Sequence, residues 1–309
     1  MLFDIMRKVA IIPCAGHSAR WNRYLGVQKH LAPLNHAGQT ILGRTVDLVK
    51  SNGLEGIYVV TDKPEIQKAQ IGASFVTPTT STYLASTILS TKEVWADRNI
   101  VLLGDVYYSS DAMKKILGDG SSIKFYGIDR ASLPVRLSKR RPEIFAFAFS
   151  MGEAETVTKA LNLNIALASV RESTPQGRFW MPRCIYYSMN VNLQSLGIDE
   201  TKADVLKRLL TYNYSPDPPQ ILKRTGLKPN RIWTICHAVI SKVCAAHLYG
   251  KLWGVYMLLA QIGPFSGEDC SWPQSDNPLF DEIDDITQDC DAPGDYHQLL
   301  SMLNRNSER

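Results

Sequence analysis

Small residues and two basic side chains follow the first apolar run of the chain. The segment after residues 9–12 reads PCAGHSAR at 13–20, and a Gln-Lys pair at 28–29 comes shortly after it. Small residues let backbone N–H groups approach phosphate oxygens closely, and Arg20 and Lys29 supply positive charge. The segment contains neither the GxxxxGK[ST] loop nor the GxGxxG fingerprint. It predicts a phosphate-binding loop of another kind, with an ordinary tight connection as the alternative.

Acidic residues that could hold a divalent cation occur at two distant places. Asp105 ends the segment LLGD at 102–105, and Asp289 and Asp291 lie in DCDAPGDY at 289–296. Mg²⁺ is commonly bound in proteins by one or two carboxylates together with substrate phosphates. Asp105 could instead cap the next helix, and Asp291 could be the N-cap of a helix that follows it. The buried face of that helix would comprise Tyr296, Leu299, Leu300 and Leu303.

Charge is distributed unevenly along the chain. The 309 residues carry a formal net charge of +4, but residues 252–304 contain ten acids and neither Lys nor Arg. The rest of the chain therefore carries a net charge of about +14. A basic body with an acidic C-terminal segment suits an enzyme that binds a polyanion and a divalent cation together. A solvated acidic loop is the alternative, and charge alone does not decide between them.

Strand-like apolar runs alternate with helical patterns through the first half of the chain, which is typical of βαβ units. This alternation predicts a three-layer α/β/α, Rossmann-like fold with a mostly parallel sheet. Ligands bind such sheets outside the carboxyl ends of the strands, where the loop, Asp62 and Asp105 would lie. Asp62 and Glu65 also predict a capping box around Pro64. The expected strands are 9–12, 57–60, 74–76, 100–103, 123–128 and 144–149, and the expected helices are 40–51, 82–96 and 110–117.

The second half of the chain has a different character. Helical patterns near 153–168, 201–212 and 233–261 suggest an α-rich insertion or subdomain. We therefore divide the chain into a nucleotide-binding α/β core at 1–169, an α-rich insertion or acceptor-side subdomain at 170–265, and an acidic C-terminal element at 266–309 that returns to the core and the metal site.

The motifs together resemble the signature of the sugar-nucleotidyltransferase and MobA-like NTP transferase superfamily. That signature is an apolar strand, AGxGxR, PKxLxPL, a helix and a second strand. Ala15, Gly16 and Arg20 match its first part, and the second part is matched by Lys29, Leu31, Pro33 and Leu34. Ser18 replaces the second glycine, and Gln28 replaces the proline. The segment at 289–296 is similar to the C-terminal DxDTPED element of the superfamily, with Ala292 and Gly294 in place of Thr and Glu.

The resemblance implies a nucleotidyltransferase that joins the nucleoside monophosphate of an NTP to a phosphorylated acceptor, such as a sugar phosphate, and releases pyrophosphate. Mg²⁺ would be the cofactor, held by Asp105 and Asp291, with Asp289 as the alternative ligand. Arg20 and Lys29 would be the catalytic residues. The nucleotide would be bound by Ala15, Gly16, His17, Ser18, Thr80, Ser81 and Ser86.

A basic cluster between two expected strands could bind the phosphate of the acceptor. Its members include Lys139, Arg140 and Arg141. A solvated loop without a binding role is the alternative, since most basic clusters of this kind are solvated loops.

Several classes of protein are disfavoured. The six cysteines form no CxxC pair, and the six histidines form no HExxH pair, so neither a zinc site nor a disulfide framework is expected. The apolar, charge-free run at 252–267, which follows a helical pattern, is short of the roughly 20 residues that a membrane span needs. We expect a cytoplasmic enzyme with no membrane or nucleic-acid partner. Two other functions remain open: a GT-A-like glycosyltransferase that uses a nucleotide-sugar, and an inactive nucleotide-binding protein.

Overall fold

The computed structural model describes residues 6–16, 18–35, 37–128, 143–172 and 278–307, and the helical residues Leu252, Val255, Tyr256 and Leu259. The chain divides into two compact units, Met1–Ala154 with Pro273–Arg309, and Glu155–Trp272. Helix α5 (Ala154–Glu172) matches the helix predicted near 153–168. The helix predicted at 201–212, and most of the one at 233–261, lie outside the described residues.

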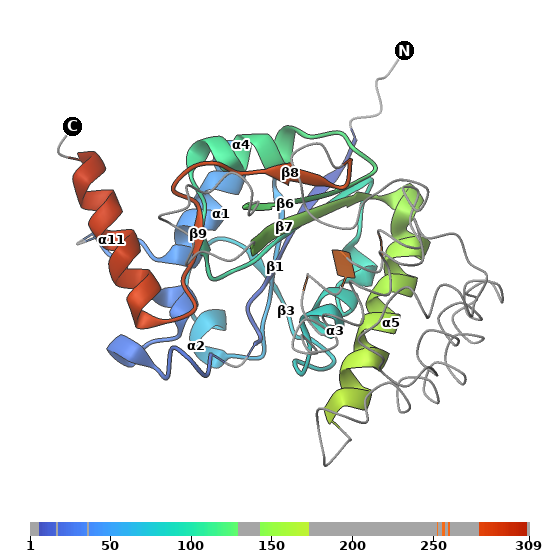
Figure 1. The fold of residues 1–309 in the computed structure, drawn as a ribbon, viewed down its shortest axis with the longest axis horizontal. Helices are drawn as coiled ribbons and strands as arrows, with labels where there is room; N and C mark the ends of the chain where they lie inside the picture. Colours follow the sequence, from blue (N-terminus) through green and yellow to red (C-terminus); the bar gives the residue numbers. More distant parts are fainter. Residues whose placement is uncertain are drawn as a thin grey trace, which may run out of the picture. The chain divides into compact units, whose positions relative to one another are not determined.

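A seven-stranded sheet forms the centre of the first unit, with the strand order β3-β2-β1-β4-β7-β6-β8. Every strand except β7 runs in the same direction, because β7 is antiparallel to both of its neighbours (Figure 1). The mostly parallel sheet predicted from the sequence is thus confirmed. Its strands are β1 (Lys8–Pro13), β2 (Gly56–Val60), β3 (Ser74–Val76), β4 (Arg98–Leu102), β6 (Ile123–Ile128), β7 (Glu143–Ser150) and β8 (Phe280–Glu282).

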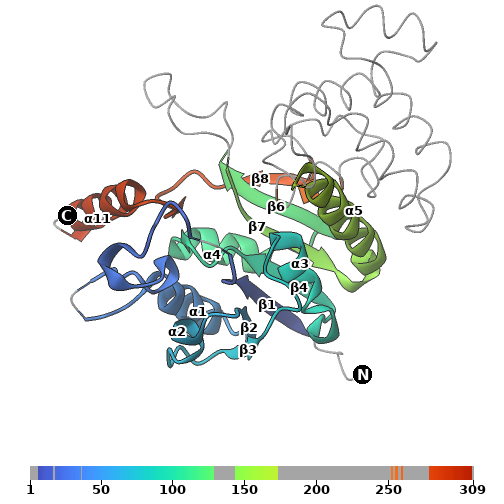
Figure 2. The ribbon, with the colours of Figure 1, turned by 90° about the horizontal axis from the view of Figure 1, so that it is seen from below.

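Helices cover both faces of this sheet and make the three layers (Figure 2). Helices α1 (Ile41–Ser51) and α4 (Ser110–Gly118) pack in one hydrophobic cluster with Ala10 and Ile12 of β1. Side chains alternate along a strand, so Val9 and Ile11 face the other side, where α3 (Leu84–Leu89) lies against β1. All four of these β1 residues are buried, which is why the strand reads as a continuous apolar run.

Two local predictions were wrong. The helix expected at 82–96 is interrupted: α3 ends at Leu89, and a short 3₁₀ turn, Lys92–Val94, follows. The hydroxyls of Ser90 and Thr91 donate to the carbonyls of Ser86 and Ile88, so these side chains compete with continuation of the helix.

The capping box expected at Asp62 and Glu65 does not form either. Helix α2 (Pro64–Gln67) starts after Lys63, which makes no side-chain capping bond. Asp62 instead accepts a hydrogen bond of 2.8 Å from the Ser81 hydroxyl, and Glu65 pairs with Arg23 at 2.7 Å. Both carboxylates therefore interact with residues distant in the sequence and do not cap the helix.

The C-terminal segment returns to the core in two steps. Strand β8 pairs with β6 at the edge of the sheet, and β9 (Gln288–Asp289) then pairs with β5 (Val106–Tyr107) in a separate two-stranded sheet. Helix α11 (Pro293–Ser307) follows. None of the helices in the described part of the chain has the length and hydropathy needed to cross a bilayer.

Candidate functional site

The loop after β1 is fastened to the neighbouring strand and has open space at its glycine. The Cys14 N–H donates to the Val60 carbonyl at 2.8 Å, and the Thr61 hydroxyl donates to the Cys14 carbonyl at 3.3 Å. Ala15 is buried and Gly16 is exposed. A Cβ atom built on Gly16 would meet no described heavy atom within 4 Å. Backbone at this position is therefore accessible to a ligand.

Ser18, at the position where the superfamily has its second glycine, presents a further polar group in this loop. Its Oγ is buried and has no hydrogen-bond partner among the described residues. Its carbonyl accepts bonds from the N–H groups of Trp21 and Asn22, at 3.1 and 3.0 Å, which turn the chain after the loop. His17, also predicted to bind nucleotide, lies outside the described residues.

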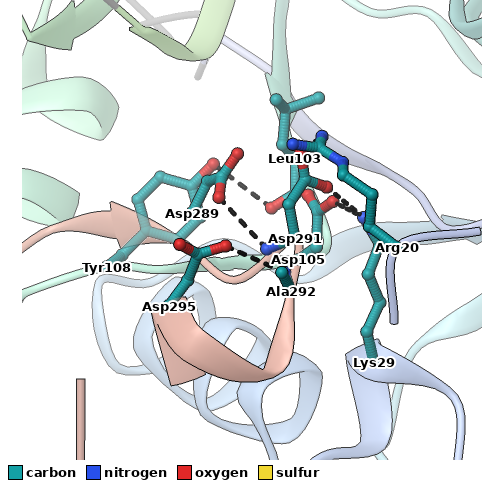
Figure 3. A network of polar contacts seen from close by, with 9 residues as sticks. All are labelled: Arg20, Lys29, Leu103, Asp105, Tyr108, Asp289, Asp291, Ala292 and Asp295. Atoms are coloured by element: carbon teal, nitrogen blue, oxygen red, sulfur yellow. Dashed lines mark hydrogen bonds and ion pairs between the residues drawn. The ribbon is translucent and has the colours of Figure 1, made fainter. Parts of the chain in front are cut away.

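Lys29 joins the two acidic elements that are far apart in the sequence. Its ammonium forms ion pairs with Asp105 and with Asp291, the latter at 2.7 Å to Oδ1, and its side chain is 11% exposed. Arg20 pairs with the other oxygen of Asp291. Figure 3 shows these four side chains in one network. The structure thus brings together the predicted catalytic and metal-binding residues, in a cluster that we call the Lys29 network.

The two-stranded sheet of β5 and β9 explains how the acidic elements meet. Val106 lies opposite Asp289, and the Cys290 N–H donates to the Asp105 carbonyl at 2.9 Å. This pairing places the segment that carries Asp291 beside the end of β4. The resulting cluster lies outside the carboxyl ends of β1 and β4, where ligands bind in α/β sheets of this kind.

Neither aspartate has the helix-capping role that was the alternative. Ser109 caps α4, since its hydroxyl accepts a bond of 2.9 Å from the Ala112 N–H. Helix α11 begins one residue later than an N-cap at Asp291 would require: the Ala292 carbonyl accepts from the N–H of Tyr296, and the Ala292 N–H donates to Asp295 at 2.8 Å. Asp105 and Asp291 are therefore free to point at Lys29.

Burial and charge set the protonation of the carboxylates around Lys29. Burial alone would raise the pKa of Asp105, but the Lys29 ammonium, together with His30 and the hydrogen bonds to the carboxylate, leaves the pKa below its usual value. Burial, reinforced by the charge of Asp105, raises the pKa of Asp289 to about 6, although the charges of Lys29 and Arg20 oppose this rise. The Oδ1 of Asp289 accepts a hydrogen bond of 3.1 Å from the Asp291 N–H, so Asp289 helps to position the backbone of Asp291. Burial lowers the pKa of His30 to about 4.

Replacing Asp289 with Asn should stabilise the metal-free protein at neutral pH. The pKa of Asp289 is higher in the folded state, so the folded protein binds a proton at this carboxylate more tightly than the unfolded chain does. The contribution of Asp289 to stability therefore falls as pH rises from about 4 to about 6. Asn keeps the acceptor for Asp291 and carries no charge. We expect Asp289→Asn to increase the free energy of unfolding by about 1–3 kcal/mol at pH 7.5 and to have no effect below pH 4.

Urea denaturation with EDTA between pH 3.5 and 8 measures this effect, with Asp111→Asn on the exposed face of α4 as the control. His30 acts with the opposite sign, since its lowered pKa makes stability rise with pH between about 4 and 6.5. Between pH 4 and pH 6.5 the stability of the Asp289→Asn variant should therefore rise more steeply with pH than that of the wild type. An equal stability difference at pH 4 and pH 7.5 would contradict the assignment.

Among the described residues, the remaining predicted site residues form no hydrogen bond or ion pair with the Lys29 network. Ser81 donates to Asp62 just beyond β2, while the Thr80 hydroxyl is 3.1 Å from that of Thr82. Ser86 is buried in α3, and its hydroxyl has no partner among the described residues. The basic cluster with Lys139, Arg140 and Arg141 lies outside the described residues.

An aromatic cluster behind the network was missed by the sequence reasoning. Trp21, Tyr24 and Tyr296 meet edge to face, with ring centroids 5.4–6.5 Å apart. The Tyr296 hydroxyl also donates to the Pro33 carbonyl at 2.5 Å. The helical spacing predicted that Tyr296 and Leu299 are buried, which is confirmed, with Leu300 and Leu303 packed partly buried against the same cluster. No pattern along the chain indicated that the partner would be Trp21, some 270 residues away.

A small-residue loop, two cations and two carboxylates at the carboxyl edge of a mostly parallel sheet define an α/β protein of the nucleotide-binding class. Residues 10–125 match the model of the MobA-like NTP transferase domain. Over these residues the chain is therefore similar to the superfamily of nucleotidyltransferases that its motifs resemble.

Solved structures of nucleotidyltransferases are among those similar to this chain. CTP:phosphocholine cytidylyltransferase from Streptococcus pneumoniae is 11% identical, with a TM-score of 0.49, over 96% of this chain and 100% of that one. The inositol-1-phosphate CTP transferase from T. maritima is 16% identical, with a TM-score of 0.36, over 48% of this chain and 72% of that one. No curated protein sequence matches the chain.

Proposed function

We propose that this protein transfers the nucleoside monophosphate of an NTP to a small phosphorylated acceptor and releases pyrophosphate. The observation that carries the proposal is the Lys29 network, which gathers Arg20, Lys29, Asp105 and Asp291 beside the open loop of a MobA-like NTP transferase domain. Positive groups and carboxylates side by side suit a substrate that arrives as a phosphate chain with a divalent cation.

In the proposed reaction a phosphate oxygen of the acceptor attacks the α-phosphorus of the NTP. A bond forms between that oxygen and the α-phosphorus, and the bond from the α-phosphorus to the bridging oxygen of the β-phosphate breaks. The electron pair leaves with pyrophosphate. An acceptor phosphate is largely ionised near neutral pH, since its second pKa is about 6, so the reaction needs no general base. Catalysis then consists of positioning and charge neutralisation.

The residues of the site have distinct parts in this proposal. Backbone N–H groups at Ala15, Gly16 and Ser18 bind the β- and γ-phosphates, and the unpartnered Ser18 hydroxyl adds a donor. Arg20, whose side chain is 64% exposed, and Lys29 stabilise the negative charge that develops on the leaving pyrophosphate. Thr80, Ser81 and Ser86 are proposed to contact the base or ribose, and residues 170–265 to shape the acceptor site.

The carboxylates fit Mg²⁺ as the cofactor. Asp105 and Asp291 already direct oxygens at a single cation, the Lys29 ammonium. In the described part of the chain no three His, Cys, Asp or Glu side chains group around one point, so this part offers the metal two carboxylates and not a complete cage. Mg²⁺ suits such a pair, because it takes its other ligands from water and substrate phosphates. When bound, it neutralises charge on the phosphates in the transition state.

The direct test is a screen of the four common NTPs against a panel of phosphorylated acceptors with Mg²⁺, in which pyrophosphate release is followed. Release of pyrophosphate that depends on both substrates is the expected result. Release of a nucleoside diphosphate from a nucleotide-sugar would instead indicate the glycosyltransferase. Binding of an NTP with no turnover on any acceptor would indicate an inactive nucleotide-binding protein.

A bulky side chain at Gly16 should block nucleotide binding without harming the fold. A Cβ at Gly16 has open space among the described residues, so Gly16→Val has room for its Cβ and occupies the volume proposed for the phosphates. We expect an unchanged melting temperature and an NTP affinity about tenfold lower or worse, a loss of about 1.4 kcal/mol. Isothermal titration calorimetry measures this affinity. Gly120→Val, at another exposed glycine with open space, is the matched control, and equal affinities in the two variants would refute the loop assignment.

A further inference from the structure

The Lys29 ammonium lies where both proposed metal ligands point. Asp105 and Asp291 approach it from two different segments, and their side chains are only 17% and 20% exposed (Figure 3). Two carboxylates this close would repel each other without a positive charge between them. In the free protein the ammonium therefore neutralises the repulsion between the two carboxylates, as a bound metal ion does in a metal site.

The charges of the four contacting groups also balance without a metal. Lys29 and Arg20 contribute two positive charges, and Asp105 and Asp291 contribute two negative ones. A divalent cation entering alone would leave these four groups with an excess of two positive charges, which is unfavourable because Lys29 and the two carboxylates are largely buried. A triphosphate with about four negative charges, bound together with the cation, would instead supply anionic partners for Lys29 and Arg20.

We propose that Lys29 is a placeholder for the metal: in the free protein it occupies the position between Asp105 and Asp291, and it moves to the phosphates when nucleotide and metal bind together. This inference rests on the proposed function, since it assumes that the two carboxylates are metal ligands. Its consequence is positive coupling between metal and nucleotide. The free protein binds the divalent cation weakly, and the nucleotide makes the site available by attracting Lys29 away.

Arg20 has a weaker part in this exclusion. Among the described residues its one ion pair is with Asp291, and its side chain is 64% exposed, against 11% for Lys29. Water and salt therefore screen its charge far more strongly. Removing the charge of Arg20 should accordingly affect metal binding much less than removing the charge of Lys29, and this difference provides an internal control.

The test measures binding of Mn²⁺, as a paramagnetic substitute for Mg²⁺, by electron paramagnetic resonance at pH 8 without nucleotide. We expect Lys29→Met to bind Mn²⁺ about tenfold more tightly than the wild type or better, because the methionine keeps the stem and loses the charge. Lys29→Arg should keep the weak binding of the wild type, and Arg20→Gln should tighten it by less than Lys29→Met. Adding Asp105→Asn to Lys29→Met should abolish the gain, since a ligand is then lost.

Mn²⁺ affinity in Lys29→Met equal to or below that of the wild type, in folded protein, would overturn the proposal. Circular dichroism and thermal melting establish that each variant is folded, and Lys29→Gln replaces the methionine variant if that one does not fold. Pyrophosphate release by the wild type tests the proposed function separately. Tighter Mn²⁺ binding by Lys29→Met with no turnover on any acceptor would support the placeholder role of Lys29 and refute the transferase activity. Turnover without tighter Mn²⁺ binding would support the transferase activity and refute the placeholder role.

Discussion

Asp105→Asn is expected to lower the rate of pyrophosphate release by about 10³-fold or more while the protein still folds. A metal ligand contributes several kcal/mol to stabilisation of the transition state, and each 1.36 kcal/mol corresponds to a factor of ten in rate. Asn has the shape of Asp but lacks the charge that attracts a divalent cation. Lys29 retains Asp291 as its partner in this variant, so the ammonium is not left unpaired in its buried position.

Three further variants make this result specific. Asp291→Asn should cause a similar loss, since Asp291 also contacts Lys29. Asp289→Asn should retain turnover at pH 7.5, because Asp289 supports the Asp291 backbone and is not proposed to bind the metal. The exposed Asp111 provides the control for loss of a carboxylate on the same unit. Steady-state rates at saturating NTP and Mg²⁺ measure all four, and wild-type turnover in Asp105→Asn would eliminate the proposed site.

Gly104→Ala is expected to destabilise the protein and to displace Asp105. A Cβ at Gly104 would overlap the Cys14 sulfur and lie 3.0 Å from the Pro13 carbonyl oxygen and 3.2 Å from His30 Cδ2. These neighbours are the end of β1 and the residue beside Lys29, so the added methyl pushes apart the segments that build the site. Overpacking of this kind costs about 1–3 kcal/mol. Turnover should fall as well, because displacements of about 1 Å at a reacting centre can cost 10²-fold in rate.

A second substitution identifies the cause of this loss. Cys14→Ala removes the sulfur atom that the new methyl would overlap, so the Gly104→Ala/Cys14→Ala double variant should recover part of the lost stability. Gly118→Ala is the control, since a Cβ there has open space among the described residues. Urea denaturation gives the free energies of the cycle. If the two effects were simply additive, steric overlap with Cys14 would not be the cause.

The α/β/α fold could be predicted because its strands are buried on both faces. Such strands appear as short continuous apolar runs, as at 9–12 and 100–103, whatever the rest of the chain does. Helix ends that depend on a neighbouring hydroxyl, such as the Thr40 side chain that accepts from the Gly43 N–H, are equally local. The sequence could not show that Ser90 and Thr91 end α3, or that Asp62 and Glu65 have tertiary partners, because each such hydroxyl or carboxylate has two competing uses with similar energies.

The sequence by itself predicted the class of the protein and the residues that we propose for its site. They are Gly16, Arg20 and Lys29 after the first strand, Asp105 after a buried one, and Asp291 near the end. Only the tertiary structure decided how these residues meet. Pairing of β5 with β9 brings Asp291 to Asp105, and Lys29 then lies between the two. Spacing along the chain carries local information, such as the face of a helix or the end of a strand. A contact between residues 29, 105 and 291 depends instead on chain reversal and strand pairing, which no local pattern encodes.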